Sequence, residues 1–288
     1  MSGRHLARVW FFQVYGDEML KTVRTHRSAL SLPVLALLVA AGPSLAAPDW
    51  DIVGIRLGMS VEQARSALRA HAPKAKVTDE SRQFSYNDGV RDQQTPSFLG
   101  SITALQEGPP GSNSETLEVM FSAPPMEQRV IRVIRTLSMY SDPLPLERAV
   151  TSVTQKYGTT PNVRQTHNGN GRVSRWVEAG KTVCGDNRPN SSDAMQAPPV
   201  DNSPSGLSQY EAWQRRKLAP ADASACGAAL VVILTPLSFQ QPLIREMKLV
   251  MTDPGYAIPA MQATAKQIAD LQARARKDRQ NSGPVPKL

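Results

Sequence analysis

Hydrophobic residues first recur at a helical spacing in residues 60–72. The apolar positions that share one helix face are Val61, Ala64 and Leu68. Ser60 and Gln63 have the spacing of a capping box, in which each side chain accepts a hydrogen bond from the other residue's backbone. The pattern predicts an amphipathic helix that ends before Pro73.

A second helical stripe begins after Pro145. Its apolar positions are Leu146, Val150, Val153 and Tyr157. Gly158 then favours a C-terminal stop, because glycine adopts the left-handed backbone that ends many helices. With an offset of 85 positions, residues 59–73 align with residues 144–158, with two identities in 15 positions. The alignment suggests an internal duplication; the alternative is two unrelated helices.

Several stretches alternate apolar and polar residues or are rich in β-branched residues, which is typical of strands. They are residues 53–57, 83–86, 101–106, 116–122, 129–137, 173–178, 228–235 and 243–251. The run Asn168-Gly169-Asn170-Gly171 predicts a hairpin turn, and a last helix is predicted from Pro259 to about Gln280. The order of these elements predicts an α+β fold with antiparallel sheets, helices on one face and two similar subdomains.

The N-terminal region has the layout of a secretory signal peptide. A positive segment with Lys21 and Arg24 precedes an apolar run over 29–41, and a small-x-small site ends at Ala46. The apolar run is shorter than the roughly 20 residues that span a bilayer. We therefore expect cleavage after about Ala46, with Met19 as the real start and a periplasmic or secreted protein; the alternative is an uncleaved anchor or a core helix.

The domain organisation follows from these elements. We expect a leader over 1–46, a first α+β subdomain over 47–140 and a second over 141–256. A basic helix and tail then occupy 257–288.

The charge is unevenly distributed along the chain. The sequence has 33 Lys and Arg against 25 Asp and Glu, a net charge of +8. Residues 1–46 carry +3 of this charge and residues 260–288 carry +4, which leaves +1 for the body between them. A nearly neutral body argues against nucleic acid as a partner.

Cys184 and Cys226 are the two cysteines of the chain. An even pair in an exported protein predicts a disulfide, here at the base of an excursion over 184–226 that is rich in Asn, Ser and Pro. The alternative is a pair of free buried thiols.

The sequence offers little catalytic chemistry. Only His71 and His167 follow the leader, and both are expected to be solvated. Arg129, Arg132 and Arg135 are expected to lie at a solvated sheet edge, with Arg132 on the opposite face from the other two. The chain lacks the zinc-protease, nucleophile-elbow and P-loop motifs. We predict no cofactor and no metal, and an enzyme is the less favoured interpretation.

Basic residues gather in the last turns of the C-terminal helix. They are Arg274, Arg276, Lys277 and Arg279. One interpretation is a helix that packs on the sheet with its cations favourably placed at the C-terminal end of the dipole. The other is a contact surface for an acidic protein or for anionic lipid headgroups.

Two short phrases carry a family resemblance. The segment Gly54-Ile55-Arg56-Leu57-Gly58-Met59-Ser60 before a helix, and the helix ending Lys156-Tyr157-Gly158-Thr159-Thr160-Pro161, resemble phrases of uncharacterised exported bacterial proteins. The helix-then-sheet unit is similar to the small outer-membrane assembly lipoprotein fold and to the secreted β-lactamase inhibitor protein, which pairs two such units. The chain lacks the lipid-attachment cysteine, and only one helix precedes each sheet. The resemblance implies binding of envelope proteins rather than catalysis, by fold-level analogy.

Three functions follow as hypotheses. The favoured one is a soluble exported binding module that contacts another envelope protein. The alternatives are a membrane-surface protein that uses the basic C-terminal helix and a hydrolase whose catalytic groups the sequence does not reveal.

Overall fold

A computed structural model of the chain describes residues 48–109, 111–182, 184, 202, 204–238 and 240–282. These residues belong to one compact unit, which spans Leu45–Leu288. The predicted leader lies outside the described residues. The chain is α+β with a large antiparallel sheet, as the sequence predicted.

Each half of the unit has one helix followed by four long strands of the nine-stranded sheet, whose remaining strand is short and precedes the second helix. The first half has α1 (Val61–His71), β1 (Lys76–Arg82), β4 (Phe98–Glu107), β5 (Ser114–Phe121) and β6 (Val130–Ser138). The second half has α2 (Leu146–Tyr157), β8 (Asn162–Thr166), β9 (Gly171–Val177), β10 (Ala229–Ser238) and β11 (Gln241–Thr252). The strand order is β1-β4-β5-β6-β11-β10-β9-β8, so the last strands of the two halves pair at the centre.

The two helices that open the halves begin 85 residues apart, the offset of the sequence alignment, while the internal duplication stays a prediction. Residue 61 opens α1 and residue 146 opens α2. Just before α1, the N–H of Gly58 donates to Val130 of β6, and Met59 accepts from it, both at 2.9 Å. The short strand β7 (Leu144–Pro145) pairs in the same way with β11 just before α2. The agreement extends from the helices to the segments that lead into them.

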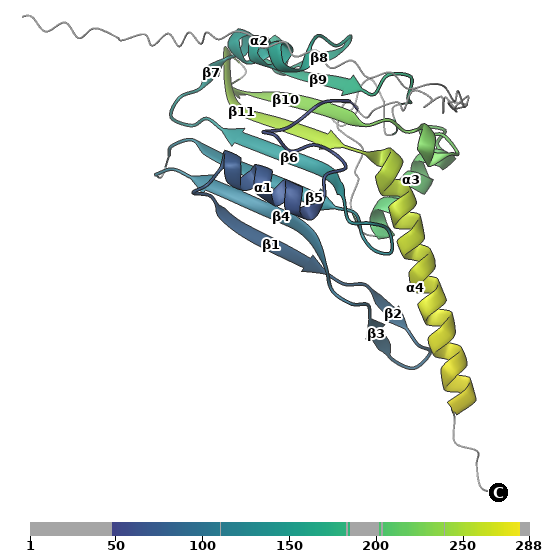
Figure 1. Cartoon of the computed structure of the whole chain (residues 1–288). Coiled ribbons are helices and arrows are strands. Elements are labelled where there is room, and N and C mark those ends of the chain that lie inside the picture. Colours follow the sequence, from purple (N-terminus) through teal and green to yellow (C-terminus); the bar gives the residue numbers. More distant parts are fainter. Residues whose placement is uncertain are drawn as a thin grey trace, which may run out of the picture. The chain divides into compact units, whose positions relative to one another are not determined.

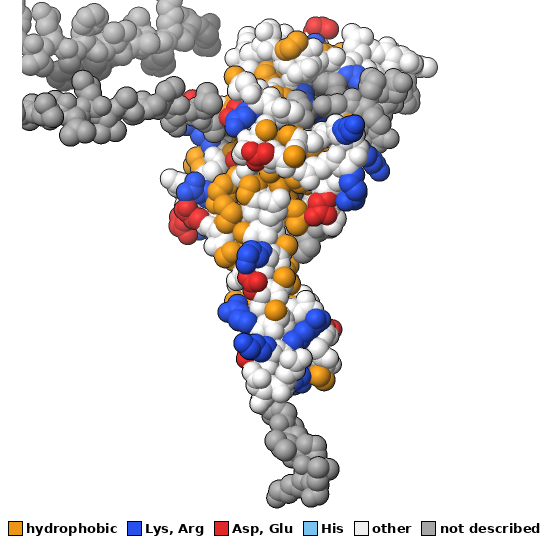
Figure 2. All heavy atoms as spheres, turned by 90° about the vertical axis from the view of Figure 1, so that its right-hand side faces the viewer, with side chains coloured by type: hydrophobic (Ala, Val, Ile, Leu, Met, Phe, Trp, Pro, Cys, Tyr) orange, Lys and Arg blue, Asp and Glu red, His pale blue; other side chains and the backbone are white. Residues whose placement is uncertain are grey.

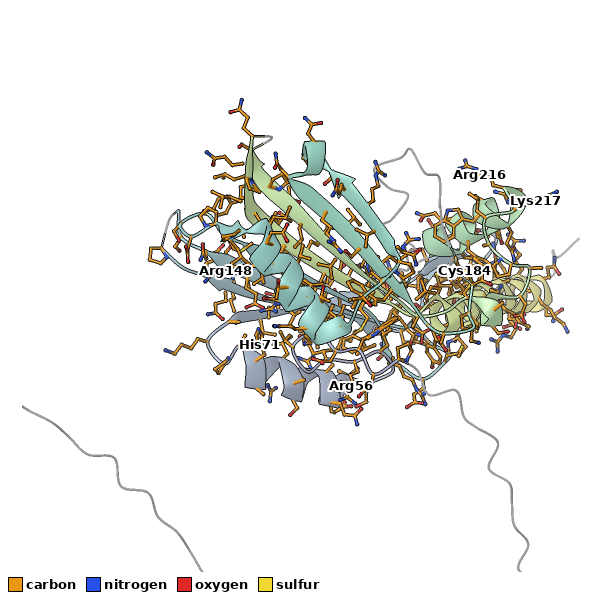
Figure 3. All side chains as sticks on the ribbon, turned by 90° about the horizontal axis from the view of Figure 1, so that it is seen from above. Arg56, His71, Arg148, Cys184, Arg216 and Lys217 are labelled. Atoms are coloured by element: carbon orange, nitrogen blue, oxygen red, sulfur yellow. A yellow bond between two sulfur atoms is a disulfide. The ribbon has the colours of Figure 1, made fainter. Side chains whose placement is uncertain are left out.

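The main core lies between the two helices and one face of the sheet (Figure 1, Figure 3). One row of opposed residues crosses both halves of this face and is almost fully buried; it contains Ile102, Val119, Val133, Met251, Leu230 and Trp176. Opposed side chains of an antiparallel sheet point to the same side. The row therefore joins both halves into one continuous core.

The helices form where the pattern predicted them. Ser60 caps α1, and both hydrogen bonds of the capping box with Gln63 are present. Leu68 and Ala64 of α1 are buried, as are Val153 and Tyr157 of α2. The Tyr157 hydroxyl donates to the backbone oxygen of Asp51 at 2.9 Å, which ties α2 to the segment that precedes α1.

Near the N-terminus one predicted strand was wrong and one strand was missed. Residues 53–57 form a tight turn, in which Ile52 and Ile55 make an isolated bridge. The Asp51 carboxylate accepts from the N–H of Gly54 at 2.6 Å, and this local bond favours a turn over a strand. Strand β1 was missed because its sequence, KVTDESR, has no buried face at the sheet edge.

The C-terminal helix begins earlier than predicted. Helix α4 runs over Pro254–Ser282, five residues ahead of the expected start at Pro259. Asp253 acts as its cap, because its carboxylate accepts from the N–H of Tyr256 at 3.0 Å. Asp-Pro is the stronger start signal, since Pro254 at the first helical position needs no hydrogen-bond partner for its nitrogen. Burial raises the pKa of Asp253.

Two insertions lie between strands of the large sheet in the sequence. A hairpin of β2 (Ser85–Asn87) and β3 (Asp92–Gln94) lies between β1 and β4 in the chain. The excursion between β9 and β10 contains α3 (Pro204–Arg215). Within the described residues, no helix combines the length and apolar character that crossing a bilayer requires.

Candidate interaction surface

The first half of α4 is firmly anchored to the rest of the unit. Ile258 and Met261 are buried in a small core that also contains Tyr210 of α3. The Thr264 hydroxyl donates to the backbone oxygens of Ala260 at 2.9 Å and Pro124 at 2.6 Å. The anchored half thus fixes the direction in which the helix leaves the sheet.

The disulfide completes this anchor. Cys184 and Cys226 are bonded, with Cα atoms 5.4 Å apart, so the predicted pairing is confirmed. Both cysteines are buried in the core formed with α3 and α4. Arg216 and Lys217, which follow α3, lie at its outer end, well away from the sheet (Figure 3).

The second half of α4 extends beyond the sheet, and the β2–β3 hairpin runs beside it (Figure 1). We call residues 265–282 of α4 and the hairpin over 85–94 the arm. The carboxylate of Asp88, in the hairpin turn, pairs with the guanidinium of Arg279. A Cβ atom on Gly89 would stand 3.5 Å from the Arg276 side chain, so the turn lies directly against the helix.

Asp88 is the electrostatic centre of this contact. Its side chain is only 4% exposed. It accepts from the backbone N–H groups of Arg91 and Val90, each at 2.9 Å, and from the Gln93 amide at 3.0 Å. The Arg91 N–H above all, then those other donors and Arg279, hold the pKa of Asp88 well below its usual range against the opposing effect of burial. The ionised Asp88 carboxylate therefore holds the hairpin against α4 at all but strongly acidic pH.

The four basic residues singled out by sequence divide into two groups. Arg279 is engaged with Asp88, whereas Arg274, Arg276 and Lys277 are exposed. Arg274 donates to the backbone oxygen of Asp270 at 3.3 Å. Arg274, after Lys266, also helps to lower the pKa of the Asp270 carboxyl, whereas Arg276 and Lys277 form no ion pair with a carboxylate of the described residues. Figure 2 shows Lys and Arg side chains gathered around the lower half of α4.

An apolar residue stands at the tip of the hairpin. Val90 is 70% exposed, the highest value among the large hydrophobic residues that the structure describes. Its neighbour Arg91 is also exposed, with its Nε atom 3.8 Å from the Asp88 carboxylate. The arm therefore presents an apolar contact beside exposed cations, a combination suited to an acidic surface with an apolar pocket. The sequence did not reveal it, because the two segments are far apart in the chain.

The other candidate residues form a separate group. The expectation of a solvated His71 was wrong: its Nε2 atom lies 2.8 Å from the Glu115 carboxylate, which Arg135 also contacts at 2.6 Å. These hydrogen bonds lower the pKa of Glu115 although burial opposes them. The expected solvated edge was wrong for Arg132 and Arg135, because β6 lies at the sheet centre, although these two do lie on opposite faces. Arg129 precedes β6, is exposed and pairs with Glu127 at 2.5 Å.

His167 stands apart from that group. It lies in the predicted turn between β8 and β9, where its ring contacts the Thr166 hydroxyl at 3.0 Å. Among the described residues, no group of three or more His, Cys, Asp or Glu could hold a metal ion.

Comparisons with known proteins found no match. No protein-family model, no curated protein and no solved structure matches the chain. The case for a function therefore rests on the arm and its surroundings.

Proposed function

We propose that the protein is an exported binding module of the bacterial envelope and that its arm contacts an acidic region of another envelope protein. The observation that carries the proposal is the placement of three exposed cations, Arg274, Arg276 and Lys277, on the helix against which the hairpin turn with the exposed Val90 lies. The arm stands clear of the sheet, so a partner can reach it from several sides (Figure 1).

Export is supported by two features. The leader has the order of charged, apolar and small residues that signal peptidases recognise. The bonded Cys184 and Cys226 fit an oxidising compartment such as the periplasm. A periplasmic or secreted location follows as part of the proposal.

A protein partner is favoured over a lipid surface. An amphipathic helix that lies in a membrane presents a continuous apolar face. In α4 the apolar residues Ile268 and Leu271 are half-buried, and the hairpin packs along the helix. Only Val90 offers a large exposed apolar side chain among the described residues of the arm. Such a surface matches the small apolar hot spot with charged surroundings of protein interfaces.

In-vivo photocrosslinking tests the proposal. A photoreactive amino acid replaces Val90 or Lys277, and Tyr140, 57% exposed outside the arm, serves as the control position. We expect one protein adduct from the two arm positions and none from Tyr140. The adduct from position 90 should disappear in the triple variant Arg274→Glu, Arg276→Glu and Lys277→Glu.

A matched charge reversal separates the arm from general basicity. The control variant Arg148→Glu, Arg216→Glu and Lys217→Glu changes the same charge at exposed sites outside the arm (Figure 3). It should keep the adduct. An adduct that survives arm reversal, or binding to anionic vesicles without any protein adduct, would overturn the proposal.

A further inference from the structure

Three side chains of β9 point toward α2: Arg172, Ser174 and Trp176. They alternate along the strand, and Trp176 and Arg172 stand opposite Leu230 and Leu234 of β10. Both leucines belong to the main core beneath the helices. Because opposed residues share a face, the β9 side chains lie on the helix side of the sheet.

These side chains line a cavity of about 120 Å³ beneath α2. Val153 of α2 and Val232 and Leu234 of β10 supply its apolar wall. The exposed residues Gly158 and Thr159, which follow α2, form its rim. The cavity therefore has a closed apolar end and an accessible side.

The Trp176 side chain carries an unsatisfied donor. The residue is 8% exposed, and its ring packs against Tyr157 with centroids 5.9 Å apart. Its Nε1 atom is buried and has no hydrogen-bond partner among the described residues. An unpaired buried donor is unfavourable, and native structures normally satisfy such groups. The indole thus needs an acceptor that these residues do not supply.

Arg172 gives the cavity a positive charge. Its Nε donates to the Ser174 hydroxyl at 3.1 Å. Among the described residues that line the cavity, none is Asp or Glu. The polar lining consists of this guanidinium together with the indole and the hydroxyls of Ser174 and several threonines. A set dominated by donors and one cation favours a negatively charged acceptor.

We propose that this cavity binds the carboxylate form of a short aliphatic acid. The carboxylate accepts from Arg172 and the Trp176 indole, and the alkyl chain lies against Val153, Val232 and Leu234. An apolar cavity of about 150 Å³ holds benzene, with six non-hydrogen atoms, so this one of about 120 Å³ suits a ligand of about five or six, with the carboxylate toward the accessible side. The site lies under α2 and not in the arm, so it is independent of the proposed partner contact.

The indole signals of the protein, labelled with ¹⁵N-tryptophan, test the proposal by NMR. The Trp176 signal is assigned by elimination with Trp→Phe variants of the other tryptophans. Titration with butanoate should shift its proton downfield and reach saturation. Butanamide, the neutral molecule of the same shape, should bind at least about tenfold more weakly, since it lacks the charge-assisted bond.

Variants of Arg172 test whether its charge is responsible for butanoate binding. Arg172→Met should weaken butanoate binding at least about tenfold, and Arg172→Lys should retain part of it. Arg148→Met, on the exposed side of α2, should leave the affinity unchanged. If Arg172→Met does not fold, the comparison of butanoate with butanamide on the unchanged protein still decides. An indole signal that does not respond, as in a cavity that holds only water, or an equal response to both compounds, would overturn the proposal.

Discussion

Asp88 and Arg279 lie 191 positions apart in the sequence and form an ion pair. The pair joins an insertion of the first half to the end of the last helix. It positions the hairpin tip, with Val90, beside the exposed cations of α4. The contact surface of the arm therefore depends on one carboxylate that α4 does not itself contain.

Removal of this charge should release the hairpin while the sheet stays intact. In Asp88→Asn the backbone amides of Val90 and Arg91 lose a charged acceptor, and Arg279 loses its partner. We expect faster hydrogen–deuterium exchange in the hairpin and in the last turns of α4, with unchanged exchange in β5 and β10. Glu107→Gln, an exposed acid at the end of β4, is the matched control. Equal exchange in the two variants would contradict the role of Asp88.

The disulfide should make a large contribution to stability. It joins residues 42 positions apart, and the chain-entropy relation gives about 4 kcal/mol for a loop of that length. The double variant Cys184→Ser and Cys226→Ser should lower the free energy of unfolding by up to that amount in urea titrations. Reduction of the unchanged protein should have the same effect, and the double variant should not respond to the reductant. A reductant that destabilises both proteins equally would show another cause.

The Glu115 contacts should make stability depend on pH. The pKa of Glu115 is lowered from its ordinary value of 4.5, so its stabilising contribution is present above that value and is lost as the pH falls through the lower pKa of the folded state. Glu115→Gln should destabilise the protein by about 1–3 kcal/mol at neutral pH. Urea titrations over a pH series should show this difference shrinking below pH 4.5. A difference that is constant with pH would indicate a packing effect only.

The N-cap of α1 should contribute less to the free energy of unfolding than the disulfide. Ser60→Ala removes the side-chain oxygen that accepts from the N–H of Gln63. The expected loss is about 1 kcal/mol in the free energy of unfolding, as for other helix caps. Ser60→Thr should restore it, because a hydroxyl accepts the same bond and can also donate to the Glu62 carboxylate, as Ser60 does at 3.0 Å. A Ser60→Thr variant no more stable than Ser60→Ala would contradict this reason.

Sequence patterns predicted the elements with one buried and one exposed face. The apolar stripe of α1 follows from burial of one helix face, and the apolar run of β10 follows from burial of both strand faces. The polar edge strand β1 was not predicted, because it has no buried face and therefore no alternation of apolar and polar residues. The same limit applied to chemistry: His71 and Glu115 meet only after the fold brings them together across 44 positions. Arg172 and Ser174 were not singled out for the same reason, because α2 covers them only in the folded chain.

The pairing of β6 with β11 has a consequence for the two halves as separate chains. Seven opposed residue pairs, from Ser138–Glu246 to Arg132–Thr252, close the centre of the sheet. A chain that ended after residue 140 would leave the outer backbone groups of β6 unpaired, next to an uncovered end of the core. Such an edge invites a second copy to add its own β6 in antiparallel orientation. In this protein the antiparallel pairing of β6 with β11 occupies that edge within one polypeptide.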